Sequence, residues 1–261
     1  MSEKNLNPMR ALRPLTSRDY RLLFAAVGIE VFGTGMWTIV MVFQVLALDD
    51  SPLALSAVAT GMSLGLFVFS ILGGVVADRF SKRRIIITVQ GCTAAVMTVV
   101  AVLSLTETIE LWHVGVASFV MGAGSAFFYP AYSAYLPQVL PPEQLLAPNG
   151  LEGALRPSMG QGLGPALGGV VVGMFFPAIG AVIVAASYAI AFILTLFLSR
   201  RDELTTVASP EQHTSVWGDL RAGVNYVVHT RWLLWTLVFG SSLALIIQGP
   251  IEVLLPFITR D

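Results

Sequence analysis

The chain has 261 residues, of which 55% are hydrophobic and only 12% are charged, and its formal net charge at pH 7 is −1. Soluble domains carry about 25% charged residues, so this composition excludes an ordinary water-soluble domain. The apolar residues fall in blocks of about twenty, the length that an α-helix needs to cross a bilayer. We therefore expect an all-α polytopic membrane protein surrounded by a lipid bilayer.

Seven apolar segments are candidate membrane-spanning helices. The first carries Glu30 and is too long for a secretory signal, so we expect it to be retained as a helix. In chain order, the segments cover residues 22–48, 55–77, 85–105, 111–136, 149–176, 178–198 and 232–258.

These segments divide the chain into four parts. They are an N-terminal segment (1–21), a six-helix bundle (22–198), a polar linker (199–231) and a seventh helix (232–261) that begins an incomplete second bundle. Within the linker, residues 215–230 have apolar side chains at three- and four-residue spacing, which predicts an amphipathic helix on the membrane surface. A plain helical linker explains this spacing equally well. Gly249 and Pro250 predict an interruption of the seventh helix.

Positive charges are distributed unevenly between the connections. Lysine and arginine precede the first segment and follow the second and the sixth, whereas the connections after the first, third and fifth segments carry none. Acidic residues occupy the first and third of these, at Asp49, Asp50, Glu107 and Glu110. Because positively charged loops stay on the cytoplasmic side, we expect the N-terminus in the cytoplasm.

The six-helix part contains a short internal repeat. The sequence L-G-G-V-V occurs at Leu72–Val76 in the second segment and again at Leu167–Val171 in the fifth. These positions fit two sets of three helices with opposite direction, the 3+3 inverted repeat of each half of a major facilitator transporter, although chance explains five residues equally well. Glycines four residues apart in the second and fifth segments predict closely packed helices.

The basic loop after the second segment has a recognisable pattern. The loop has the pattern of a glycine followed by three residues, then Asp-Arg and a run of basic residues. This pattern resembles the loop motif of the major facilitator superfamily, except that Ser81 occupies a position where that family usually has glycine. The resemblance implies that this loop latches one conformation against a second bundle; the alternative is that the charges only fix topology. A nucleic-acid site would need a larger basic surface, so we expect no nucleic-acid partner. The motif residues are Gly74, Asp78, Arg79, Lys82, Arg83 and Arg84.

The fifth segment carries a second motif, G-x-x-x-G-P-x-x-G-G, which is similar to that of the superfamily's antiporters. Its residues are Gly160, Gly164, Pro165, Gly168 and Gly169. The glycine that often begins the motif is absent, and Leu151 occupies its place. Together with 141–151, Arg156 and 219–227, these residues resemble the bacterial branch that holds the enterobactin exporter and macrolide-efflux-type proteins.

This resemblance implies a fold and a function. The fold is the major facilitator fold, here a six-helix N-terminal bundle plus the first helix of the second. The implied function is proton-coupled export of small amphipathic organic molecules (drug, macrolide or siderophore class) across the bacterial cytoplasmic membrane by alternating access, with the proton gradient in place of a cofactor. The missing second bundle is expected in cis or on a partner chain; a truncated, non-transporting half is the alternative.

Ionisable residues inside membrane segments are candidates for function, because burying a charge in a bilayer is costly. Glu30 and Arg156 are expected at similar depth, where they face one cavity and pair; alternatively, Arg156 pairs with Glu152 four residues earlier. A polar and aromatic stripe on each of two segments either lines a substrate pocket or makes helix contacts. The stripes contain Thr34, Trp37 and Gln44 in the first segment, and Ser125, Tyr129 and Tyr132 in the fourth.

An intramembrane enzyme is the competing class of protein. Ser125 lies in G-A-G-S-A, but His113 is on the same segment, about 18 Å away by helical rise, so no catalytic dyad forms. The sequence has no phosphate-binding loop and no metal-ligand cluster. We expect a transporter that is not an enzyme and holds no metal.

Overall fold

The computed structural model describes residues 12–199 and 225–258, and every regular element in these ranges is a helix. Five of the helices, α2, α3, α4, α5 and α8, are long and apolar enough to cross a membrane. The elements are η1 (Arg13–Thr16), α2 (Arg18–Leu48), α3 (Pro52–Arg79), α4 (Lys82–Leu105), α5 (Leu111–Val139), η2 (Pro142–Gln144), α6 (Leu146–Arg156), η3 (Pro157–Leu163), α7 (Gly164–Met174), α8 (Pro177–Leu196) and α11 (Arg231–Ile258).

The all-α membrane fold is confirmed, and most predicted segments lie within single helices. The fifth is an exception, because it is divided into α6, a π-helical segment η3, and α7. Pro157 begins η3 and Pro165 follows it, and each proline removes one backbone donor from the helical hydrogen-bond ladder. A wider helical turn between the two prolines is the result.

Serine residues cap the beginnings of α3 and α4. The Ser51 hydroxyl accepts a hydrogen bond from the Ala54 amide at the start of α3. At the start of α4, the Ser81 hydroxyl accepts one from the Arg84 amide at 3.4 Å. Serine is a favoured N-cap, so the residue that departs from the family pattern provides the cap of α4.

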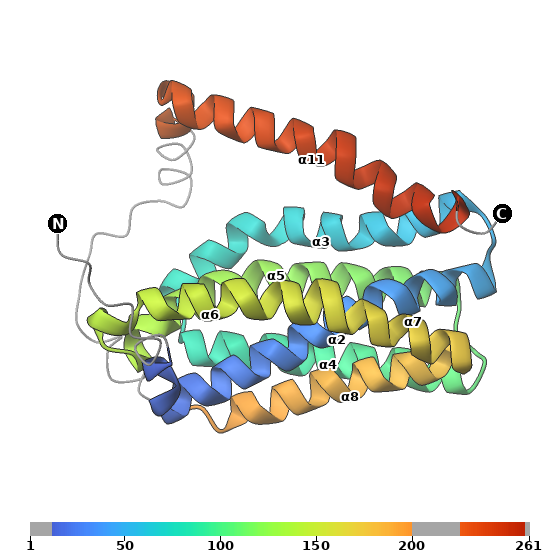
Figure 1. The fold of residues 1–261 in the computed structure, drawn as a ribbon, viewed down its shortest axis with the longest axis horizontal. Helices are drawn as coiled ribbons and strands as arrows, with labels where there is room; N and C mark the ends of the chain where they lie inside the picture. The colour runs from blue at the N-terminus through green and yellow to red at the C-terminus, as the bar shows by residue number, and fades with distance from the viewer. Residues whose placement is uncertain (1–11, 200–224, 259–261) are drawn as a thin grey trace.

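Glycines bring pairs of helices into backbone contact. A Cβ atom on Gly65 would collide with the Phe119 carbonyl of α5, and one on Gly35 with the Gly160 carbonyl of η3. The α3–α5 pair and the pair of α2 with η3 and α7 are therefore packed closely, as small residues allow in a membrane. Figure 1 shows these helices side by side in one bundle with α4 and α8.

The packing agrees with an inverted repeat. In the two copies of L-G-G-V-V, Gly73 would collide through a Cβ with the Ala126 carbonyl of α5, and Gly168 would approach the Met36 carbonyl of α2 to 3.1 Å. The next glycine of each copy, Gly74 or Gly169, has no described atom near its Cβ position. Gly73, and not Gly74 of the loop motif, thus makes the close helix approach within the described residues.

The end of α8 is held by three other helices at the side of the bundle where the basic loop lies. The Arg83 guanidinium donates to the carbonyls of Leu196 and Leu198 at 3.0 and 2.7 Å. Asp19 of α2 accepts from the Ser199 amide and hydroxyl at 3.2 and 2.8 Å. Tyr135 of α5 donates to the Ser199 carbonyl. These bonds satisfy backbone groups that a helix end leaves open.

The seventh segment forms α11, which continues past Gly249 and Pro250, so the expected interruption is wrong. A proline removes one hydrogen bond but is tolerated within membrane helices. In Figure 1, α11 stands apart from the main bundle, and it contacts α3. The predicted amphipathic helix lies mostly outside the described residues; of 215–230, only 225–230 are described, and 225–229 are helical.

Candidate functional site

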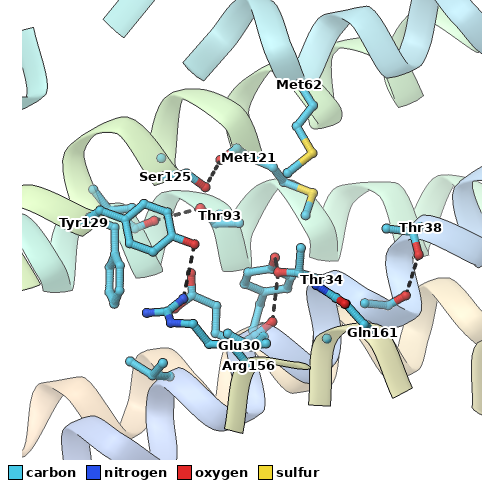
Figure 2. A pocket seen from close by; sticks show the side chains of 18 residues that line it. Glu30, Thr34, Thr38, Met62, Thr93, Met121, Ser125, Tyr129, Arg156 and Gln161 are labelled. Atoms are coloured by element: carbon cyan, nitrogen blue, oxygen red, sulfur yellow. Dashed lines mark hydrogen bonds between the residues drawn. The ribbon is translucent and has the colours of Figure 1, made fainter. Parts of the chain in front are cut away.

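A cavity of about 260 Å³ lies inside the six-helix bundle. Figure 2 shows its polar and charged side chains directed at one another from different helices. Most come from α2 and α5, with others from α4, α8 and the α6–η3 junction. The labelled lining residues are Glu30, Thr34, Thr38, Met62, Thr93, Met121, Ser125, Tyr129, Arg156 and Gln161.

Glu30 is the cavity's carboxylate. It lies about three turns into α2, and its Oε2 accepts a hydrogen bond from Gln90 Nε2 of α4 at 2.6 Å. Gln90 is only 1% exposed, and its Oε1 has no hydrogen-bond partner in the described part of the chain. Glu30 is thus joined to a buried amide that keeps one unused acceptor.

Arg156 is the cavity's cation, at the last residue of α6. Its Nε and Nη2 donate to Glu152 Oε2 at 3.2 and 3.0 Å, and its Nη1 donates to the Tyr129 hydroxyl at 3.3 Å. The guanidinium also lies over the Tyr129 ring, 5.1 Å from the centroid, at cation–π distance. Arg156 therefore pairs with Glu152, the second of the two alternatives, while still lining the same cavity as Glu30 (Figure 2).

Hydroxyl groups line the wall next to Glu30. The Thr34 hydroxyl lies 2.7 Å from the Tyr188 hydroxyl of α8 and donates to the Glu30 carbonyl at 2.9 Å. Thr38 and Ser125 donate to carbonyls of their own helices, those of Gly35 and Met121. Threonine and serine satisfy their donors in this way inside membrane helices, and their oxygens are still acceptors on the cavity wall.

Three residues expected in the cavity lie elsewhere. Trp37 is 2% exposed and belongs to the hydrophobic core; Gln44 is 6% exposed and accepts from Ser104 of α4 at 3.2 Å. Tyr132 is buried, stacks on Phe128 and donates to Glu152. The residues of the stripe do share one face of α2, as expected. The cavity, however, extends only about two turns from Glu30, and beyond that point this face of α2 packs against other helices.

Sequence reasoning missed several residues that the structure brings to the site. Gln90 contacts Glu30 directly, and Gln161 and Tyr188 line the cavity. Gln90 lies inside an apolar segment, and the cost of a buried amide is the signal that could have identified it. Gln161 lies within the antiporter-like motif, where only the glycines and the proline were considered.

The second motif shapes the site through the backbone. Gly160 and Gly164 pack against α2, with an added Cβ on Gly164 lying 2.6 Å from the Phe32 carbonyl. The π-helical turn that ends at Leu163 places Gln161 on the cavity wall. The motif therefore fixes how closely the α6–η3–α7 segment approaches Glu30 and its neighbours on α2.

The residues of the first motif do not belong to this cavity. Asp78 and Arg79 are exposed at the end of α3, and Lys82 begins α4. The described hydrogen bonds of Arg83 hold the end of α8 within the same bundle, and its expected part in a latch stays a prediction. Arg84 is exposed on α4.

Comparison with known proteins agrees with this architecture. Residues 9–261 match the family of transmembrane secretion effectors. An MFS-type transporter of Bacillus subtilis (strain 168), YfiS, is 23% identical over 239 residues, covering 90% of this chain and 56% of that protein. Macrolide efflux protein A of Streptococcus pyogenes is 22% identical over 249 residues, covering 92% and 58%. No solved structure matches the chain.

The fold and these matches place the chain in the major facilitator superfamily of multi-pass membrane transporters. Within that superfamily, the chain belongs to the transmembrane secretion effector family. It spans a little over half the length of the curated relatives that it matches.

Proposed function

We propose that this chain provides the first bundle of a proton-coupled exporter in the bacterial cytoplasmic membrane. The exporter moves small amphipathic organic molecules by alternating access, with its N-terminus in the cytoplasm. The observation that carries this proposal is the Glu30 carboxylate, which faces a central cavity from a membrane-spanning helix and shares that cavity with Arg156. Ionisable groups at such positions are characteristic of proton and substrate pathways.

The neighbourhood of Glu30 suits a group that gains and loses a proton. When Glu30 is deprotonated, Gln90 Nε2 donates to it. When it is protonated, its hydroxyl can donate to Gln90 Oε1, the acceptor that has no partner in the described structure. Both states thus have a hydrogen-bond partner on one side chain, which lowers the cost of either state in a buried site.

The cavity walls suit an amphipathic substrate. Tyr129, Phe128 and Met121 supply apolar and aromatic surface, while Glu30 and Arg156 supply one charge of each sign. The similarity to macrolide efflux protein A supports a drug-like substrate. The proton gradient supplies the energy, with no organic cofactor or metal.

A second six-helix bundle completes the proposed transporter, either in cis or on a partner chain. The small-residue face of α7 supports a second bundle, because no described atom lies near the Cβ positions of Gly169 and Gly173. The same is true of Gly74 on α3. Faces of this kind favour helix packing in membranes. Asp78, Arg79 and Lys82 lie at the same end as Gly74, where they can latch the two bundles together.

The proposal is tested with the variant Glu30→Gln in the complete transporter, expressed in cells that lack other efflux pumps. Export of erythromycin, driven by an imposed proton gradient, is measured in everted membrane vesicles. We expect uptake into the vesicles to fall to the level of vesicles without the protein, because glutamine cannot release a proton. Undiminished gradient-driven uptake would contradict the role of Glu30.

Matched variants separate the proton site from general damage. Glu143→Gln changes an exposed carboxylate outside the cavity and should leave transport unchanged. Gln90→Leu should impair the coupling of transport to the proton gradient. Gln44→Leu should affect this coupling less, because it removes a buried amide that is hydrogen-bonded to Ser104 and does not line the cavity. Equal loss in both glutamine variants would mean that the effect comes from packing.

A further inference from the structure

A second cavity, a groove of about 580 Å³, lies between α3, α4 and α5. Its walls are mainly apolar, and Phe69 of α3 contacts the rings of Phe119 and Phe127 of α5 at centroid distances of 6.0 and 5.7 Å. The groove is open to the outside of the bundle, where Thr88 and Cys92 of α4 are exposed. An apolar groove that opens toward the membrane can hold a hydrocarbon chain.

The length of the groove matches one leaflet of a bilayer. Its lining residues on α4 run from Arg84 to Thr93, a separation of nine residues and therefore about 13 Å of helix. Half of the hydrocarbon core of a bilayer is about 15 Å. A chain that enters at the Arg84 end thus reaches close to the middle of the membrane.

One end of the groove is cationic, and the proposed orientation places this end at the cytoplasmic membrane surface. Arg84 and Phe80 line this end, at the connection between α3 and α4, and Phe80 is 60% exposed. Arg79 and Lys82 lie in the same connection, with Asp78 as its acidic residue. Arginine presents five donors to a phosphate group, and basic sites between helices on the cytoplasmic side recognise anionic lipid headgroups.

We propose that this groove is a binding site for an anionic phospholipid of the cytoplasmic leaflet. One acyl chain lies along Phe69, Phe119 and Phe127, and the phosphate lies at Arg84. The inference uses the proposed membrane orientation, but it is independent of the proposed transport activity.

The site is adjacent to the central cavity. Val89, Thr93 and Gly124 line both the groove and the cavity, so a single layer of residues separates them. At this layer, a Cβ added to Gly124 would lie 3.2 Å from both Thr93 Oγ1 and Val89 Cγ1. A lipid acyl chain in the groove would therefore support one wall of the central cavity from outside.

The single cysteine of the chain, Cys92, lines the groove and reports on its occupancy. The rate at which a maleimide fluorophore alkylates Cys92 is measured for the purified 261-residue chain in a neutral detergent. Dioleoylphosphatidylglycerol should slow alkylation severalfold, and dioleoylphosphatidylcholine at the same concentration should have little effect. Equal protection by both lipids would overturn the proposal, because the groove would then accept an acyl chain whatever the headgroup.

Two arginine variants test the headgroup contact. Arg84→Gln should reduce the protection by phosphatidylglycerol to the level of phosphatidylcholine, without changing the rate in detergent alone. Arg79→Gln removes an equal charge from an exposed residue that does not line the groove, and should keep the protection. Equal loss in both variants would indicate general attraction to a basic surface and would also overturn the site.

A third variant tests the contact of the lipid acyl chain with the groove without changing the charge of the protein. Ala123→Leu narrows the groove while Arg84 is retained. Native mass spectrometry should show phosphatidylglycerol retained by the wild-type chain and lost from Ala123→Leu. Retention by this variant would show that the lipid binds elsewhere.

Discussion

Glu152 of α6 uses both of its carboxylate oxygens, one toward α5 and one within its own helix. One oxygen accepts from the buried Tyr132 hydroxyl of α5, and the other accepts from the Arg156 guanidinium one turn later on α6. Charge-assisted bonds of this kind are stronger than neutral ones. Glu152 therefore holds Arg156 in place at the edge of the cavity.

Replacing Glu152 by alanine should destabilise the bundle. The Tyr132 hydroxyl would be left buried without its acceptor and Arg156 without its counter-ion, at a cost of about 2 kcal/mol. The thermal unfolding midpoint of the purified chain in detergent should fall clearly. Glu143→Ala, which removes an exposed carboxylate, is the control; a midpoint equal to that of the control would show that these bonds do not contribute to stability.

At this scale, the sequence predicted local pairing better than cavity lining. The four-residue spacing of Glu152 and Arg156 was sufficient to propose their pair. The burial of Trp37 and Gln44 was not predictable, because a stripe on a membrane helix indicates a face but not how far along that face a cavity extends. The partner of Glu30, Gln90, lies on another helix and 60 residues away, beyond the reach of spacing rules.

Among the helices, the two L-G-G-V-V copies give a sharp test of packing. Gly73 faces the Ala126 carbonyl of α5, whereas its neighbour Gly74 faces open space within the described structure. In the 261-residue chain, Gly73→Ala should lower the thermal unfolding midpoint because the added methyl forces α3 away from α5. Gly74→Ala should leave the midpoint unchanged or raise it slightly, since alanine favours helix by up to about 1 kcal/mol over glycine.

The same comparison applies to Gly168 and Gly169, the equivalent positions in the second copy. We expect Gly168→Ala to be the more damaging of the two, because its methyl would lie close to Met36 and Ile39 of α2. If the second glycine of either copy were the sensitive one, the packing register described for that copy would be wrong.

Arg83 provides a second test among the helices, at the end of α8. Its bonds to the Leu196 and Leu198 carbonyls satisfy two acceptors of the kind that a helix terminus leaves open. Arg83→Ala should therefore speed amide hydrogen exchange in the last turn of α8, measured by mass spectrometry. Arg79→Ala, an equal change in charge in the same connection, should not; faster exchange in both variants would point to a loss of loop charge as the cause.

The helices themselves were largely predictable, and their irregularities were not. Apolar length and flanking charges predicted the five long spans, because a bilayer requires such segments. The π-helical segment Pro157–Leu163 escaped prediction, since Pro157 and Pro165 indicate lost backbone donors but not whether the chain kinks, stops or widens. At Gly249 and Pro250, the same rule predicted a break where α11 continues.

In the whole molecule, the internal repeat determines both how the helices pack and on which side of the membrane each charged connection lies. The pair α3–α5 and the pair of α2 with α7 are packed through equivalent glycines, and the first members of the two three-helix sets, α2 and α5, supply Glu30 and Tyr129 to the cavity. Antiparallel sets of three helices place successive connections on alternate sides of the membrane. Orientation is then determined by which connections carry the positive charges.

This orientation can be measured directly because the chain has a single cysteine. In a Cys92→Ser background, Glu107→Cys places a thiol in the exposed connection between α4 and α5, and Glu143→Cys places one in the connection between α5 and α6. A membrane-impermeant maleimide added to intact cells should label Glu107→Cys, and should label Glu143→Cys only after the membrane is permeabilised. The Cys92→Ser chain without an added cysteine controls for background labelling. The opposite pattern would place the basic connections outside the cell, and it would remove the basis for assigning the Arg84 end of the lipid groove to the cytoplasmic leaflet.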